Sequence, residues 1–193
     1  MSEPRFRQLT LEELDDEQRR VIEPIVAFFG SFEGPFNPTL RSAPISEMAF
    51  ALGQHLLFES TLPRPLTEMA VLIRARYSFS QLEWWAHRRL GREAGLSDAI
   101  CEALREGRRP DAMTEDEATI YDFSIELLKA PAVSDETFAR ARDAFGERGV
   151  VELTHVLGFY GMISLVLKMA EIGAPDGSTP LESMADPFPL AAV

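Results

Sequence analysis

Glu83 and His87 are the residues whose types and spacing best suit chemistry in this sequence. They lie four residues apart in YSFSQLEWWAHRRLGREAGL, residues 77–96, so their side chains are neighbours on a helix. On a helical wheel both fall, with Ser80, inside the arc that the apolar residues form. A carboxylate and an imidazole held together away from solvent are suited to proton transfer.

Glu68 is a second carboxylate in apolar surroundings. It belongs to RPLTEMAVLIRARY, residues 64–77, a segment that is apolar nearly all round and is therefore expected to be a central helix. A buried carboxylate is costly unless it is neutralised or hydrogen-bonded, so Glu68 needs a partner. His87 and Ser80 on the next helix are the candidates. Glu68, Glu83, His87 and Ser80 thus form the predicted catalytic group.

Ordinary structural explanations exist for each of these features. A Glu and a His one helical turn apart are often a plain side-chain pair, and Trp84 is typical of core packing. Cys101 is expected to be a small buried hydrophobe, and His55 and His155 more often satisfy a local hydrogen bond than do chemistry.

A metal site is a further interpretation of the three ionisable groups, because they offer oxygen and nitrogen ligands. Glu-x-x-x-His is not the Glu-x-x-His of di-iron bundles, however, and no third strong ligand is evident. We therefore predict no metal and no cofactor.

Arginine is concentrated in residues 74–109, which contain eight arginines and five acidic residues in a chain that is otherwise strongly acidic. Such arginines usually form a solvated helix face or ion pairs. Alternatively, one of them binds a carboxylate of the substrate. Arg74 and Arg76 are the candidates, with Tyr77 and Trp84 as further predicted substrate contacts.

The segments that position these residues carry sequence patterns typical of helices. Capping boxes occur at Thr10 with Glu13 and at Thr114 with Glu117, and no hairpin signal links alternating strands. The sequence predicts an all-α protein with seven or eight helices. The expected helices cover residues 10–29, 44–60, 65–78, 80–94, 97–106, 114–129, 134–145 and 147–172.

The expected organisation is one main domain with two additions. The loop GSFEGPFNPTLRSAP has three prolines and two glycines, which predicts a boundary between an N-terminal helical extension, residues 1–34, and a helical domain, residues 35–172. Residues 173–193 are proline-rich and lack basic residues. We expect this tail to be extended, and either loose or lying on a neighbouring subunit.

Composition excludes several classes of function. The 19 basic and 31 acidic residues give a net charge of −12, which argues against nucleic acid or an anionic membrane as partner. No segment reads as a signal peptide or membrane span, so a cytoplasmic location is expected. The only cysteine, Cys101, allows no internal disulfide and no dithiol chemistry.

The block LPRPLTEMAVLIRARYSFSQLEWWAHRRLGREAGLSDAICEAL resembles the core of the carboxymuconolactone decarboxylase family, within the alkyl hydroperoxidase D-like superfamily. The superfamily's peroxidase motif is a glutamate, eleven residues, and then Cys-x-x-Cys-x-x-x-His. Glu68 and His87 match its glutamate and histidine, while Ser80 and Glu83 stand at the thiol positions. Neither residue can replace a thiolate that attacks peroxide, so peroxidase activity by that route is not expected.

The resemblance implies a cofactor-independent carbon–carbon lyase that acts on a small carboxylated lactone or a related anionic acid, as in aromatic catabolism. In this scheme Glu68 orients His87, Glu83 or His87 supplies a proton, and an arginine stabilises the anion. It also implies a homo-oligomer, a trimer or hexamer, with a dimer as the alternative. The same groups suit an isomerase or a hydrolase, and a binding or assembly protein that kept the fold without catalysis is the remaining alternative.

Overall fold

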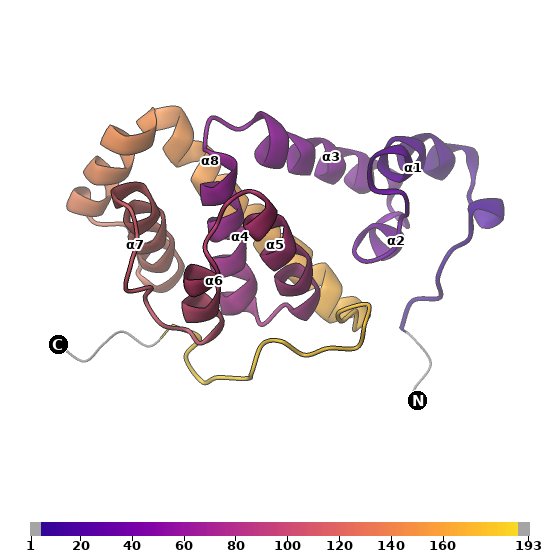
Figure 1. Cartoon of the computed structure of the whole chain (residues 1–193). Helices are drawn as coiled ribbons and strands as arrows, with labels where there is room; N and C mark the ends of the chain where they lie inside the picture. Colours follow the sequence, from indigo (N-terminus) through magenta and orange to yellow (C-terminus); the bar gives the residue numbers. More distant parts are fainter. Residues whose placement is uncertain (1–4, 189–193) are drawn as a thin grey trace.

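The computed structural model describes residues 5–188, and every regular element within them is helical (Figure 1). The all-α prediction is therefore confirmed. The elements are η1 Leu11–Glu13, α1 Asp16–Phe29, α2 Phe36–Thr39, α3 Ala43–Gln54, η2 His55–Glu59, α4 Arg64–Ser78, α5 Gln81–Glu93, α6 Asp98–Arg105, α7 Glu115–Lys129 and α8 Asp135–Ala170.

Capping side chains set where four of the α-helices, α1, α6, α7 and α8, begin. The Thr114 hydroxyl accepts a hydrogen bond from the backbone of Glu117, and the Thr114 N–H donates to the Glu117 carboxylate at 2.7 Å, so the predicted capping box opens α7. The helix expected over residues 10–29 begins later than predicted. The first part of that segment makes one 3-10 turn, the backbone becomes extended at Leu14, and α1 begins only after Asp15, which caps it.

The long C-terminal helix has the expected break. Gly146 has φ +69° and ψ 169° inside α8, which separates the two predicted helices at the one residue type that takes this conformation readily. Two other elements differ from expectation. The segment expected to be one helix over residues 44–60 ends as a π-helical turn, η2, and the short helix α2 lies in the proline-rich loop.

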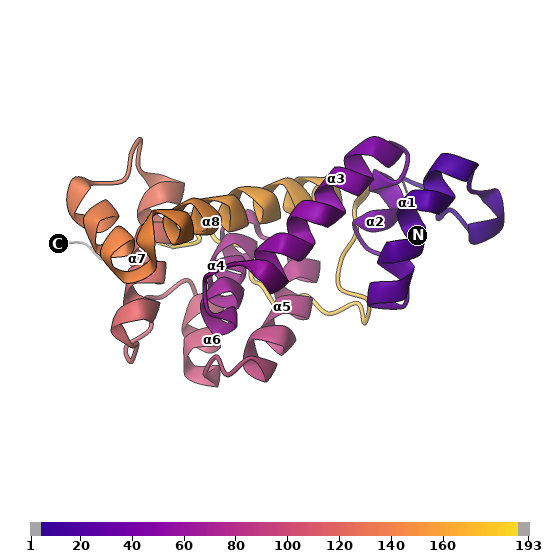
Figure 2. The same cartoon turned by 90° about the horizontal axis from the view of Figure 1, so that it is seen from above.

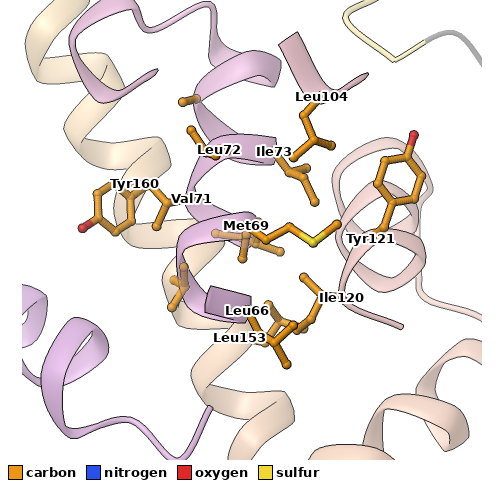
Figure 3. Packing of buried hydrophobic residues seen from close by; sticks show 14 of the residues in the cluster. Leu66, Met69, Val71, Leu72, Ile73, Leu104, Ile120, Tyr121, Leu153 and Tyr160 are labelled. Carbon is orange, nitrogen blue, oxygen red and sulfur yellow. The ribbon is translucent and has the colours of Figure 1, made fainter. Parts of the chain in front are cut away.

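Helix α4 lies at the centre of the molecule and packs against α5, α6, α7 and α8. Its buried residues include Leu66, Met69 and Leu72, which belong to the main hydrophobic core. Figure 3 shows Leu66 and Met69 on the side of α4 where Ile120 of α7 and Leu153 of α8 lie. Because α4 is covered on nearly all sides, its nearly continuous apolar sequence is explained.

The N-terminal helices form a second, smaller core at one end of the elongated molecule (Figure 2). It contains Val21, Ile22 and Ile25 of α1 together with Leu40 and Ala43. This core draws on residues on both sides of position 34, so it extends across the predicted boundary. The division into an N-terminal extension and a main domain stays a proposal.

Residues 173–188 of the C-terminal tail pack on their own chain, so the expectation that this part is loose was wrong. Contact of the tail with a neighbouring subunit stays a prediction. The tail runs from the end of α8 past α5 and α6 (Figure 1). Leu181 and Phe188 are buried in the main core, and Gln81 exchanges two hydrogen bonds of 2.9 Å with the backbone of Leu181. Its last five residues lie outside the described part of the chain.

Helix α8 is long and apolar enough, by length and composition alone, to cross a membrane. Half of its most apolar stretch is buried inside the fold, however, and α4 and α7 pack against it. We therefore interpret α8 as the core helix of the bundle. The predicted cytoplasmic location stays a prediction.

Candidate active site

Helices α4 and α5 bring Glu68, Glu83 and His87 together. The two helices are joined by a tight turn in which Phe79 adopts a left-handed conformation and the Ser80 N–H donates to the Ala75 carbonyl. The His87 Nδ1 lies 2.7 Å from the Glu68 Oε2, and its Nε2 lies 3.3 Å from the Glu83 Oε2. All three residues are buried, with exposed fractions of 0, 5 and 6% for Glu68, Glu83 and His87.

Arg64 completes the cluster from the first turn of α4. Its Nη2 lies 2.5 Å from the second carboxylate oxygen of Glu68, and its Nη1 donates to the Leu57 carbonyl at 2.6 Å. The guanidinium also lies over the Phe58 ring, 4.5 Å from its centroid. At 27% exposure, the Arg64 side chain is the most accessible member of the cluster. Positive and negative groups therefore alternate from Arg64 through Glu68 and His87 to Glu83.

This arrangement determines the protonation of His87. Burial by itself lowers the pKa of the imidazole, but the charges of Glu68 and Glu83 and their hydrogen bonds outweigh it and raise the pKa from 6.5 to about 9. At neutral pH His87 is accordingly an imidazolium ion. It can donate a proton to a reacting group and then be reprotonated.

Tyr160 of α8 closes one side of the cluster. Its ring packs edge-on against the imidazole of His87, with the centroids 4.7 Å apart. Burial, together with the negative charges of Glu83 and Glu68, raises the pKa of the Tyr160 hydroxyl well above its usual value. Tyr160 is therefore a neutral phenol beside the charged groups.

Ser80 is buried one turn before Glu83, as its spacing predicted. Its hydroxyl makes no hydrogen bond within the described chain. The residue lines a separate hollow of about 310 Å³ together with Ser164 and Gly173. The structure thus places Ser80 at the N-cap of α5, where the backbone is still extended, and does not join it to the proton-handling cluster.

Within the described chain, no ion pair or hydrogen bond joins the four predicted substrate contacts to Glu68 or His87. Arg76 donates to the backbone of Glu182 at 2.7 Å and contacts the Met184 sulfur, so it anchors the tail. The Arg74 guanidinium packs over Gly161 of α8. Tyr77 donates to the Leu128 carbonyl at 2.9 Å, and Trp84 is fully buried in the main core. These residues thus contact other helices and the tail, and the Nε atoms of Arg74 and Arg76 and the indole N–H of Trp84 stay without an acceptor in the described chain.

Sequence reasoning missed Arg64 and Tyr160. Arg64 stands four residues before Glu68, which is the spacing of a helical ion pair, but it lies among prolines and outside the arginine-rich segment. Tyr160 comes from a distant helix, and no spacing rule connects it to His87.

The other two histidines take no part in this cluster. The His55 Nδ1 lies 3.3 Å from Glu59, and the His155 Nδ1 lies 2.7 Å from the Val151 carbonyl. Between residues 5 and 188 we find no group of three or more His, Cys, Asp or Glu arranged to hold a metal ion.

The fold is that of the alkyl hydroperoxidase D-like proteins. The chain superposes on the AhpD core of an uncharacterized peroxidase-related protein from Ralstonia eutropha JMP134, with a TM-score of 0.74 over 90% of this chain and 93% of that one, at 18% sequence identity. No family model matches the sequence. No curated protein matches it either. At this identity, the structural likeness shows the fold alone.

The raised pKa of His87 makes folding stability depend on pH. Because the folded pKa is about 9 and the unfolded pKa 6.5, the ionised pair stabilises fully below about pH 6.5, and the contribution is lost as the pH rises through 9. The loss is about 3 kcal/mol. Urea unfolding from pH 6 to 10 should show this decline in the parent and not in His87→Asn. Parallel stability curves for the two proteins would contradict the expectation.

Proposed function

We propose that this protein is a cofactor-independent lyase that decarboxylates a small carboxylated lactone or a related organic acid. The observation that supports this most is the His87 imidazolium held between two carboxylates in a buried site. Loss of CO2 leaves an enolate-like anion that needs a proton, and an imidazolium shielded from water is a suitable donor.

Each charged group has a role in this reaction. Glu68 contacts Nδ1 and Arg64 together, so it fixes the orientation of the imidazole and keeps it charged. The contact between Nε2 and Glu83 is longer, at 3.3 Å, which makes Nε2 the nitrogen that a substrate atom can approach. The carbon–carboxylate bond breaks, its electron pair enters the enolate, and the proton passes from Nε2 to carbon. Glu83 then helps to reprotonate His87.

Arg64 replaces Arg74 and Arg76 as the proposed anion-binding residue. It is the only arginine with an ion pair to a described residue of the cluster, and it is the member that reaches solvent. The neighbouring Phe58 ring is 52% exposed, so apolar surface flanks this approach. A substrate carboxylate on Arg64 would lie within reach of the Glu68–His87 pair.

Isomerase and hydrolase reactions use the same groups, and product analysis separates them from decarboxylation. The purified protein is incubated with carboxymuconolactone in D2O. Decarboxylation releases CO2 and leaves one deuterium on the carbon of the enolate-like anion that accepts the proton. Isomerisation or hydrolysis retains all the carbon. Failure of the folded protein to release CO2 above the uncatalysed rate would contradict the lyase proposal.

A catalytically silent binding or assembly protein is the second candidate. The nearly complete burial of Glu83 and His87 favours it, since a closed and fully paired cluster also serves as a structural element. The two candidates differ in what isosteric substitutions of the cluster change: turnover per folded molecule in the lyase, and stability alone in the silent protein.

Thiol-dependent peroxidase activity, which the name of the structural neighbour suggests, is not proposed. Cys101 is buried in the main core, and burial raises the pKa of its thiol, which disfavours the reactive thiolate. We expect the purified protein to show no thiol-dependent peroxide reduction, and Cys101→Ala to keep its native activity within about threefold of the parent. Peroxide turnover that disappears in Cys101→Ala would contradict this assignment.

We also propose that the protein is a homo-oligomer, a trimer or a hexamer. Apolar residues on α3 and α8 are exposed in the single chain. The exposed groups of the two helices meet at a hollow that Leu52 of α3 and Val151 of α8 both line. The exposed residues are Ile45, Met48, Leu52, Val151, Met162, Leu165 and Met169. This is more apolar surface than scattered exposed residues provide.

Light scattering at micromolar concentration should report an oligomer for the parent. Leu165 is 66% exposed at the centre of the α8 part of this surface, so Leu165→Glu should dissociate the oligomer. Arg142→Glu, on the exposed first part of α8, is the control and should remain assembled. A monomeric parent would refute the proposal.

A further inference from the structure

A hollow of about 750 Å³ lies between α5 and residues 176–180 of the tail. Its lining includes Trp84, Trp85, Arg88, Arg92 and Asp176. Positions 84 and 88 follow Glu83 and His87 by one residue each, so they face about 100° around the helix from the proposed catalytic cluster. We propose that this hollow binds a small aromatic carboxylate, at a site separate from that cluster.

Arg88 supplies the cation for such a ligand. The other charged groups of the lining are already paired, because Arg89 contacts Glu93 at 2.8 Å, Arg92 contacts Asp98 at 2.7 Å, and Asp176 accepts from Trp85. Arg88 makes no ion pair or hydrogen bond with any residue between 5 and 188, and its Nε is buried without an acceptor. A guanidinium that has no bound anion can donate two parallel hydrogen bonds to the oxygens of a carboxylate.

Trp84, which also lines the hollow, provides a second unpaired donor. It lies one turn before Arg88, is fully buried, and its indole N–H has no acceptor within the described chain. Leaving a buried donor unpaired costs about 1–3 kcal/mol. Two donors one turn apart on α5 are therefore without an acceptor, which a bound carboxylate supplies once the Arg88 side chain adjusts to it.

The aromatic part of the ligand is inferred from Trp85. Its ring is 38% exposed, and its N–H donates to Asp176 at 2.9 Å, which fixes the indole against the tail. An indole face held in this way stacks on planar rings. The volume lies within the range of about 300–1,000 Å³ that is usual for small-molecule sites.

The test uses the fact that Trp84 and Trp85 are the only tryptophans of the chain. A ¹H–¹⁵N spectrum therefore contains two indole signals, and both report on this hollow. Titration with benzoate should shift both signals to saturation, with a Kd on the order of 1 mM for a ligand of this size. Cyclohexanecarboxylate lacks the aromatic ring and benzyl alcohol lacks the charge, so each should bind at least about tenfold more weakly than benzoate.

Substitutions then identify the cation. Arg88→Gln should weaken benzoate binding by about tenfold or more, whereas Arg89→Gln, on the same helix but already paired, should change the Kd by less than about threefold. Unchanged melting temperatures establish that both variants are folded. If Arg88→Gln does not fold, Arg88→Lys is used in its place. The proposal is overturned if the indole signals do not saturate, if Arg88 variants bind like the parent, or if inorganic phosphate binds as tightly as benzoate. No step of this test depends on the proposed lyase activity.

Discussion

Replacing Glu68 and His87 together is expected to lower turnover little more than the more damaging single replacement does. Glu68 fixes and charges the imidazole, so once His87 is gone its contribution to the reaction has no target. Glu68→Gln, Glu83→Gln and His87→Asn should each reduce turnover about 10²–10⁴-fold, which is the range of general acid–base groups.

This experiment also decides between the enzyme and the catalytically silent protein. Turnover and melting temperature are measured on the same samples, with Glu93→Gln on the exposed face of α5 as the control. A purely structural cluster would lose melting temperature and keep its turnover per folded molecule in all three single variants. Additive losses in the double variant would show that the residues act independently.

Truncating Glu68 to alanine should have the largest effect on stability among the substitutions considered. Its carboxylate is fully buried and contacts both Arg64 and His87, at 2.5 and 2.7 Å. Its removal leaves two cations facing each other with Glu83 as their remaining counter-charge. Breaking a buried ion pair in this way costs about 3–5 kcal/mol, which corresponds to a fall in Tm of roughly 10 °C for a chain of this length.

Glu93→Ala is the matched control for that measurement. Glu93 also pairs with an arginine four residues away on its helix, but both side chains are more than half exposed. Exposed pairs of this kind contribute less than about 1 kcal/mol. Urea unfolding of both variants at pH 7 gives the comparison. If Glu68→Ala costs no more than Glu93→Ala, the cluster is not the strongly coupled charge network described above.

Local sequence signals accounted for the helices that carry the site. The periodicity of residues 64–96 indicated α4 and α5, and the cost of burying Glu68 indicated a partner on the next helix, where the structure places His87. These inferences succeeded because they depend on spacing within one helix or between consecutive helices.

Contacts between distant segments were beyond such reasoning. Arg76 was expected at the site, yet it binds the backbone of the tail 106 residues away. Tyr160 approaches His87 from α8, and the tail covers α5 because Leu181 and Phe188 find buried positions in the main core. Each depends on how complete helices pack, which the periodicity of single segments does not contain.

The protonation of His87 is the most direct measurement of the central claim, that a buried imidazolium between two carboxylates holds the proton for the reaction. The chain has three histidines, so His87→Asn identifies the His87 signals in a ¹H–¹⁵N spectrum of the imidazole nitrogens. We expect both nitrogens to carry protons at pH 7, a titration near pH 9, and a lower pKa in Glu68→Gln. A neutral His87 at pH 7, titrating at or below 6.5, would contradict the account.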